Sequence, residues 1–169
     1  MGLAGDLNYD PNSFAGPFNE SELRSFENWL HASGFDKINF DPSYVSHLKS
    51  FHGGMPGKRY FVTAAGTDDA VERFLNFLAY RSGHRLVEYS VECTWSNIND
   101  RLTDSQMPFA ELFAGDYLCF DFETGNPGKV VMWFHELSRE GKPHTEFVAN
   151  SFEEFLDMLS DVLPSVKPT

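Results

Sequence analysis

The sequence is short of basic residues. Its 169 residues include 13 Lys and Arg against 25 Asp and Glu, so the formal net charge is −12. A protein that binds nucleic acid or an anionic membrane normally presents a basic face, and this balance argues against both classes. It favours a basic protein as the partner, because opposite charges speed encounter. Acidity that only keeps the protein soluble would explain the charge equally well.

Long apolar runs and cysteines are also scarce. No window of the sequence approaches the length of a membrane span, and residues 1–6 lack the basic region and apolar core of a signal peptide. The only two cysteines, Cys93 and Cys119, are expected to be reduced thiols, and a disulfide between them is the less favoured alternative. These absences predict a cytoplasmic protein.

The sequence has no complete phosphate-binding or metal-binding motif. Residues 53–58 (GGMPGK) resemble a phosphate-binding loop, but the spacing of the glycines is one residue short. Arg59 stands where a Ser or Thr must hold magnesium, so a helix end followed by a turn is the better interpretation. His47 and His52 are five residues apart, which is the wrong spacing for a metal shared on one helix. We therefore predict no metal and no cofactor.

The pair His135 and Glu136 is the best catalytic candidate that remains. An imidazole beside a carboxylate can serve as a general base. Adjacent residues of a strand point to opposite faces, however, so the two side chains need not meet. No nucleophile or third ligand follows at a characteristic spacing. We therefore predict no catalytic residue, and a protein that is not an enzyme.

Aromatic and apolar residues are abundant, at 15% and 41%, with 17 Phe. This composition predicts a folded protein, and its length predicts a single domain. The centre is expected at residues 115–136, where two apolar runs, 116–122 and 129–135, flank a loop of turn-forming residues. Apolar residues lie on both faces of each run. This pattern places the predicted hairpin inside a sheet rather than at its edge.

Helices are predicted near both ends of the chain. The first begins at Asn19 and ends at Gly34, and the second begins at Asp41-Pro42. The last begins at the capping box of Ser151 and ends at Pro164. The side chains expected on their inner faces are Leu23, Phe26, Trp29, Leu30, Tyr44, Val45, Leu48, Phe51, Phe152, Phe155, Leu156 and Leu159.

Strands are predicted mainly in the middle of the chain. Residues 59–63, 87–92 and 147–148 have strand character, and a short helix over 94–102 is expected to start at Thr94. Residues 71–80 suit either state, but their periodicity favours a helix. Strands in the middle with helices at the ends indicate an α+β fold, in which helices pack on one side of a mostly antiparallel sheet.

Four motifs in a fixed order resemble the SUKH superfamily, the Smi/Knr-type family. The first runs from the helix over 41–51 through HGGMP to RYF, and the others are 109–122 (FAELFAGDYLCFDF), 131–136 (VMWFHE) and 148–156 (VANSFEEFL). Together they span about residues 20–162. The positions that carry the match, here called the fold-signature residues, are Asp41, Pro42, Gly53, Gly54, Pro56, Gly115, Asp116, Trp133, His135, Phe152 and Phe155.

The resemblance has structural implications. It implies that residues 71–77 form a strand, contrary to their periodicity, and we adopt the strand. It implies a SUKH-like domain over residues 19–163, with an irregular arm over 1–18 and a short tail over 164–169. The fold-signature residues are implied to be structural. Partner-binding residues vary between members, so none can be assigned from the resemblance.

The resemblance also has functional implications. Bacterial members are immunity proteins that bind and neutralise a toxin of a polymorphic or contact-dependent system, often a nucleic-acid-directed enzyme. Fungal members are regulatory scaffolds of cell-wall synthesis. With the acidic charge, this predicts a cytoplasmic immunity protein that covers a basic cognate toxin. A non-catalytic scaffold that binds a host protein is the alternative, and an enzyme centred on His135 and Glu136 is the third hypothesis.

Overall fold

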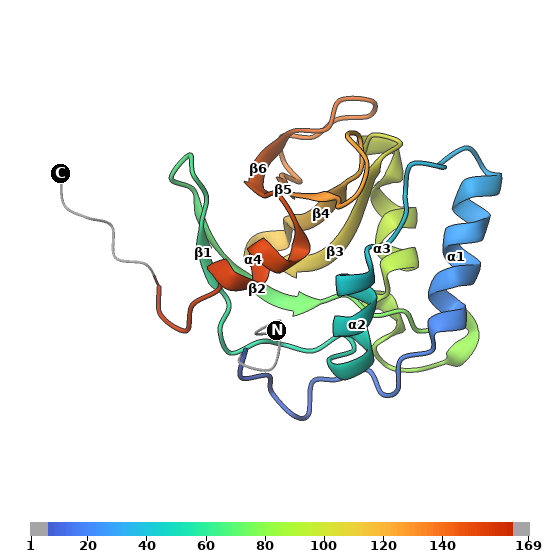
Figure 1. Ribbon diagram of the computed structural model, residues 1–169, viewed down its shortest axis with the longest axis horizontal. Coiled ribbons are helices and arrows are strands. Elements are labelled where there is room, and N and C mark those ends of the chain that lie inside the picture. The colour runs from blue at the N-terminus through green and yellow to red at the C-terminus, as the bar shows by residue number, and fades with distance from the viewer. Residues whose placement is uncertain (1–6, 164–169) are drawn as a thin grey trace.

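The computed structural model describes residues 7–163 and shows one six-stranded antiparallel sheet with helices packed against it (Figure 1). The strands lie in the sheet in chain order: β1 (Tyr60–Val62), β2 (Asp68–Phe74), β3 (Gln106–Leu112), β4 (Tyr117–Asp121), β5 (Lys129–Trp133) and β6 (Thr145–Ala149). The α-helices are α1 (Glu20–Ala32), α2 (Pro42–Ser50), α3 (Val91–Ile98) and α4 (Phe152–Met158). The predicted single-domain α+β fold is confirmed.

The hairpin of β4 and β5 lies inside the sheet, as predicted. Leu118 pairs with Met132 and Phe120 pairs with Val130, while β3 and β6 flank the hairpin on either side. These four side chains are fully buried. A strand that is apolar on both faces can only be satisfied between two neighbouring strands and under a covering layer.

The sheet curls, so that its first and last strands approach each other beside α4. Glu146 of β6 accepts hydrogen bonds from Thr63 and Thr67 of the β1–β2 turn, at 2.8 and 2.9 Å. Just beyond α4, Ser160 forms a bridge with Tyr60 of β1. Helix α4 thereby spans the gap between the two edges of the curled sheet (Figure 1).

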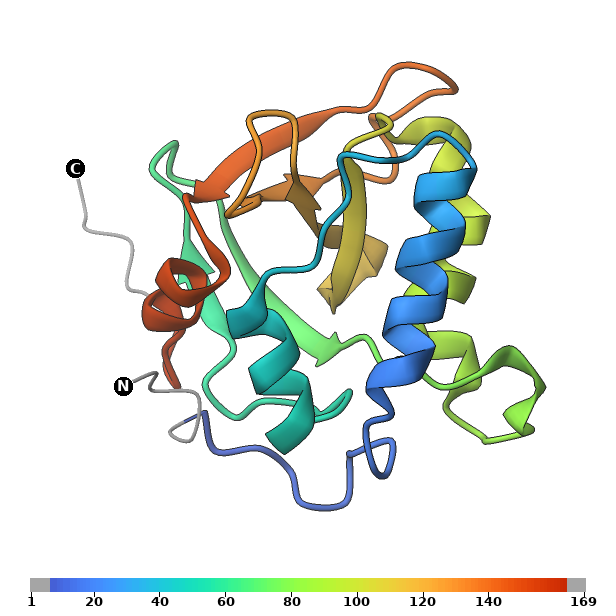
Figure 2. The same ribbon diagram turned by 45° about the vertical axis from the view of Figure 1, so that its right-hand side comes forward.

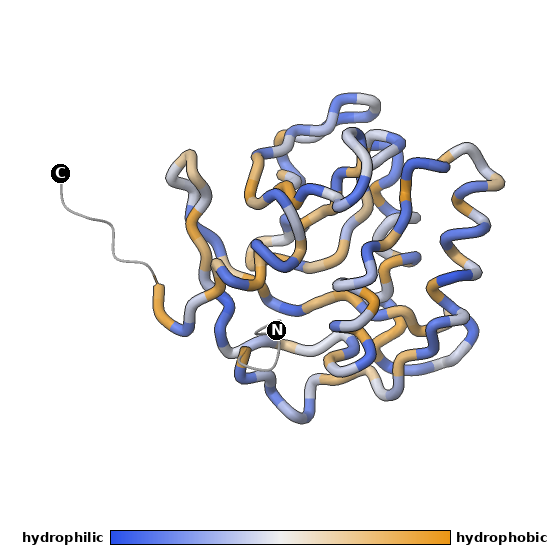
Figure 3. Tube along the Cα trace, in the orientation of Figure 1, coloured by the Kyte–Doolittle hydropathy of each residue, from blue (hydrophilic) through white to orange (hydrophobic). Residues whose placement is uncertain are grey.

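An aromatic core fills the space between the sheet, α2 and α4. Tyr44 of α2 contacts Phe120 of β4 and Phe152 of α4, with ring centroids 4.9 and 5.2 Å apart. Phe109 of β3 stacks on Phe120 at 4.1 Å. Apolar segments concentrate along the central strands, whereas much of α1 is hydrophilic (Figure 3). None of the helices among the described residues is long and apolar enough to cross a membrane.

Helices α1 and α3 lie side by side at one side of the molecule (Figures 1 and 2). Trp95 of α3 contacts the Phe26 ring of α1 edge-on at 6.0 Å, and the Phe35 ring at 5.3 Å. Asn19 caps α1 as predicted, because its side chain accepts the N–H of Ser21. Trp29, however, does not point inward with Phe26: it is 52% exposed.

Two sequence predictions about the middle of the chain are wrong. Residues 87–92 are not a strand: a 3₁₀ turn, η3 (Val87–Tyr89), leads directly into α3. The helix starts at Val91 rather than at Thr94, because the Ser90 hydroxyl accepts the N–H of Cys93 at 3.1 Å. Thr94 is instead buried in the helix.

Residues 71–74 lie in β2, so the strand that the family resemblance implies is confirmed there and the helix that periodicity favours is wrong. The backbone of Leu75 and Asn76 continues in extended pairing, with Leu75 N–H donating to Phe109 and Asn76 N–H donating to Tyr89. The end of α4 also differs from prediction. Ser151 caps it as predicted, but the helix ends at Met158, and Pro164 lies outside the described residues.

Candidate protein-binding surface

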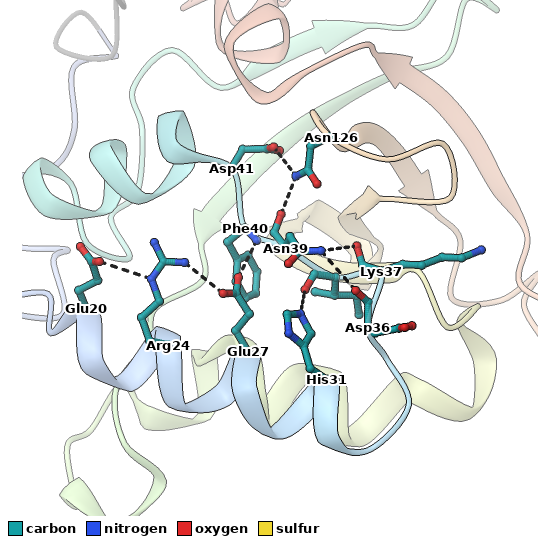
Figure 4. Close-up of polar contacts among 11 residues, drawn as sticks. Glu20, Arg24, Glu27, His31, Asp36, Lys37, Asn39, Phe40, Asp41 and Asn126 are labelled. Atoms are coloured by element: carbon teal, nitrogen blue, oxygen red, sulfur yellow. Dashed lines mark hydrogen bonds and ion pairs between the residues drawn. The ribbon is translucent and has the colours of Figure 1, made fainter.

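The fold-signature residue Asp41 occupies the N-cap position of α2, as predicted, but its side chain serves as a structural link (Figure 4). Its side chain makes no capping bond to α2, although Pro42 starts that helix as predicted. One carboxylate oxygen accepts from Asn126 at 2.7 Å, and the other accepts the N–H of Gly128 at 3.0 Å. We call residues 33–41, which join α1 to α2, the strap. Within this strap, the N–H of Phe40 donates to Glu27 of α1 at 2.8 Å. Buried Asp41 therefore ties α2 to the loop between β4 and β5.

Gly53 and Gly54 pack against residues 7–18, and buried Pro56 follows them in the same turn. Gly53 has φ +69°, a conformation that favours glycine. A Cβ atom added to Gly54 would lie 2.5 Å from the ring of Phe14, so the arm can pack closely only against a glycine. The described part of the arm has no helix or strand, yet it is fixed by packing against this turn.

Two buried histidines hold the same arm. The Tyr9 hydroxyl is 2.7 Å from Nε2 of His47, and the Tyr9 ring stacks on Phe51 at 4.7 Å. Nε2 of His52 accepts the N–H of Phe77, so its Nδ1 carries the proton and donates to the Gly16 carbonyl. Burial lowers the pKa of His47 to about 4 and also lowers the pKa of His52. Both imidazoles are therefore neutral near pH 7 and serve packing.

The fold-signature residues Gly115, Asp116, Trp133 and His135 meet at the turn before β4 and the end of β5. Gly115 has φ +87° in the turn, and Asp116 accepts the N–H of His135 at 2.8 Å. The Trp133 indole is fully buried and donates to the carbonyl of Arg101 at 3.0 Å. These contacts fasten the central hairpin to the segments around it.

The third hypothesis, a catalytic pair, finds no organised site at His135 and Glu136. Both residues are exposed, and no hydrogen bond joins their side chains among the described residues. The His135 ring instead meets the edge of Trp133 at 6.1 Å. The described residues also contain no group of three His, Cys, Asp or Glu side chains that could hold a metal ion. The remaining fold-signature residues, Phe152 and Phe155, are buried in the aromatic core.

Two hollows lie elsewhere, between α1, α3 and the loop that precedes α3. One hollow of about 330 Å³ is lined by Tyr80, Val87, Glu88, Glu92, Cys93, Ser96 and Asn97. A second hollow of about 190 Å³ is lined by Glu22, Ser25, Phe26, Trp29 and Glu92. Because Glu92 lines both, the hollows adjoin. We call this surface the α1–α3 groove; the two helices that contribute to it, α1 and α3, lie at the right of Figure 2.

Helical spacing explains why these side chains gather. Glu22, Ser25 and Trp29 lie three and four residues apart, so they share one stripe of α1. Glu92 and Ser96 are four residues apart on α3 and therefore also share a face. Contact between the Trp29 and Trp95 rings, 5.7 Å apart and nearly perpendicular, fixes the two helices at this spacing. The two stripes form the walls of the groove.

The groove combines exposed aromatic rings with carboxylates. Trp29 is 52% exposed and Tyr80 is 73% exposed. The carboxylates are Glu22, Glu88 and Glu92, and neither hollow is lined by a Lys or an Arg. No ion pair within residues 7–163 involves these three carboxylates; the ion pairs found there join Arg24, Lys37 and Lys49 to other acids. Their charges are thus available to a partner.

Sequence reasoning did not find this groove. It treats Trp29 as an inner residue and places Glu92 in a strand, so the two never meet in the predicted fold. The sequence did contain a signal for this helix. Ser90 is a good N-cap residue, and the apolar residues Val91, Trp95 and Ile98 that follow it have helical spacing.

Residues 20–156 match the family model SUKH_6, described as SMI1-KNR4 cell-wall. The SPbeta prophage-derived uncharacterized protein YokK of Bacillus subtilis (strain 168) is 31% identical over 96 residues, which cover 57% of this chain and 46% of that protein. The chain thus spans about half the length of the curated relative that it matches. No solved structure matches the chain.

Proposed function

Because the chain belongs to the SMI1-KNR4 cell-wall family, SUKH_6, as its four motifs predict, we propose that it is a cytoplasmic immunity protein. In this proposal it binds a cognate bacterial toxin and neutralises it by covering the toxin's working surface, with no reaction of its own. Family membership fits an immunity or SMI1-KNR4-like role. The toxin, its neutralisation and the cytoplasmic location are the proposed part.

The observation that supports this proposal most is the acidic, aromatic α1–α3 groove on a chain of net charge −12. An enzyme that acts on nucleic acid must present a basic cleft to phosphates. An acidic protein surface competes for that cleft and is drawn to it at long range. Exposed aromatic side chains then supply contact area once the two surfaces meet.

The position of the fold-signature residues also supports a binding role. Asp41, Gly54 and Trp133 are all occupied in holding elements of the fold together. His135 and Glu136, the pair with catalytic potential in the sequence, are exposed on a loop at the end of β5. A binding protein needs only a stable scaffold and a shaped surface, and this chain has both.

The test is to co-express the chain with a candidate protein toxin taken from the genes adjacent to its own. The proposal predicts that the two proteins elute as a one-to-one complex in size-exclusion chromatography with light scattering, and that the cells survive. A toxin from an unrelated system serves as the control and should remain free. If the cognate toxin also elutes alone and the cells die, the proposed function is wrong.

A regulatory scaffold that binds a host protein is the second candidate, and the cell-wall description of the family model favours it. The two candidates differ in what surrounds the gene. A toxin gene directly adjacent supports immunity, whereas a gene that stands alone supports the scaffold. Replacing His135 by Ala tests the enzyme hypothesis in either setting, since full biological activity of this variant would exclude a catalytic imidazole.

A further inference from the structure

We propose that the α1–α3 groove is the partner-binding surface and that it receives an arginine-bearing basic segment of a protein partner. This inference rests on the proposed function only in requiring a protein partner. It adds where the partner binds and which side chain it inserts, neither of which family membership provides.

The shape and lining of the groove single it out. The larger hollow is bordered by the apolar side chains of Tyr80, Val87 and Cys93, and its polar rim includes Glu88 and Glu92. Interface centres typically combine a buried aromatic or apolar pocket with a polar rim. In the free chain, Tyr80 is 73% exposed, so a partner that covers it would remove apolar surface from water.

The chemistry of the groove favours arginine over other occupants. A guanidinium stacks on an aromatic face and pairs with a carboxylate through two parallel N–H bonds, whereas an ammonium does only the second, as a point charge. The groove offers both partners side by side, Tyr80 with Glu88 and Glu92 in one hollow, and Trp29 with Glu22 and Glu92 in the other. An acidic peptide would be repelled by the same carboxylates.

Neighbouring cations do not neutralise the groove. Arg81 and Arg85 are exposed on the loop that follows Tyr80, but neither lines the hollows. Arg24 of α1 is paired with Glu20 and Glu27 on the side of the helix that meets the strap (Figure 4). Among the described residues Glu22 and Glu92 form no ion pair, so both carboxylates can pair with an incoming cation.

The test maps the binding of a hexa-arginine peptide to the full ¹⁵N-labelled chain by NMR titration, with hexa-lysine as the comparison peptide. The proposal predicts that hexa-arginine shifts the amide signals of residues 22–29 and 88–97, and that it binds more tightly than hexa-lysine. The double variant E22K/E92K should weaken binding by roughly tenfold or more, because two attractions become repulsions. Its matched control is E153K/D157K on the exposed face of α4, which should stay within about twofold.

An aromatic variant separates stacking from charge. Tyr80→Ala leaves every carboxylate in place and should still weaken hexa-arginine binding by about threefold or more, through lost stacking. A far-ultraviolet circular dichroism melt confirms that each variant is folded. Signal shifts centred on α4, equal binding of hexa-lysine, or equal losses in the two double variants would each overturn the proposal.

These results do not depend on a toxin, so a wrong function and a wrong surface are distinguishable. If a toxin complex forms with wild type and is unchanged in E22K/E92K, the proposed binding surface is wrong and the proposed function is supported. If hexa-arginine binds in the groove but no toxin complex forms, the proposed binding surface is supported and the proposed function is wrong.

Discussion

At the residue scale, Asp41 occupies the position that its motif predicts, but its side chain has a different structural role from the predicted one. The sequence predicts it as the cap of α2, and it does occupy that position, but its carboxylate accepts from Asn126 and Gly128 of the central hairpin. Asp41→Asn keeps the shape and replaces one acceptor oxygen with a donor, which leaves a buried N–H group unpaired. We expect the free energy of unfolding to fall by about 1–3 kcal/mol in urea titration.

The control for Asp41→Asn is Asp157→Asn on α4, where the carboxylate is exposed. This control should change stability by less than about 0.5 kcal/mol. Equal stability of Asp41→Asn and wild type would mean that the strap does not depend on this carboxylate.

His47 predicts a loss of stability in acid. Burial lowers its pKa in the folded chain to about 4, whereas the unfolded chain keeps the ordinary value near 6.5. Above about pH 6.5 the imidazole is neutral in both states and stability is unaffected. As pH falls from about 6.5 toward 4, only the unfolded chain gains the proton, so up to about 3 kcal/mol of stability is lost. His52 acts in the same direction.

The measurement compares urea midpoints at pH 7 and pH 4.5 for wild type and for His47→Gln. Carboxylates titrate alike in both proteins, so the difference between them isolates the imidazole. We expect a clearly smaller acid loss in His47→Gln. The same loss in both proteins would show that His47 is not buried in its neutral form.

At the element scale, the predicted and missed elements differ in what determines them. The β4–β5 hairpin is readable because both faces of each run are apolar, and only an interior position satisfies that pattern. The sequence pattern does not determine where α3 starts, since Ser90 and Thr94, four residues apart, are both acceptable N-cap residues. Backbone bonds from Asn76 to Tyr89 and from Val91 to Asn76 decide between them, and these depend on tertiary structure.

Because the start of α3 was predicted wrongly, sequence analysis also missed the α1–α3 groove. Trp29 lies one residue, about 100° of helix rotation, from buried Leu30, so apolar character alone does not tell which of the two faces the core. The fold class therefore follows from sequence patterns and the family resemblance. A surface made by two helices meeting edge to edge follows only from their placement in space.

The packing of the arm, residues 7–18, against Gly54 leads to a prediction about stability. Gly54→Ala places a Cβ atom where the rings of Phe14 and Tyr9 pack, 2.5 and 2.9 Å away. We expect a loss of about 1–3 kcal/mol in the free energy of unfolding, because a packed arm must shift. Ser50→Ala at the exposed end of α2 is the control and should be nearly neutral. A neutral Gly54→Ala would mean that the arm yields without cost.

At the scale of the whole molecule, the net charge is negative and the α1–α3 groove is also lined by carboxylates. The chain carries a net charge of −12, and the α1–α3 groove adds a local reason for a cation to settle at one place on it. In the proposed complex, long-range attraction would speed encounter, and exposed Trp29 and Tyr80 would supply the short-range contacts. Such a complex should weaken as salt rises, because surface charges are screened.

The most direct measurement is isothermal titration of a candidate toxin, taken from the genes adjacent to that of this chain, into wild type, E22K/E92K and E153K/D157K. The account predicts a saturable one-to-one complex with wild type and the α4 control. It predicts that affinity falls by roughly tenfold or more in the groove variant. A wild-type chain that gives no saturable binding, or a groove variant that binds as tightly as wild type, would contradict it.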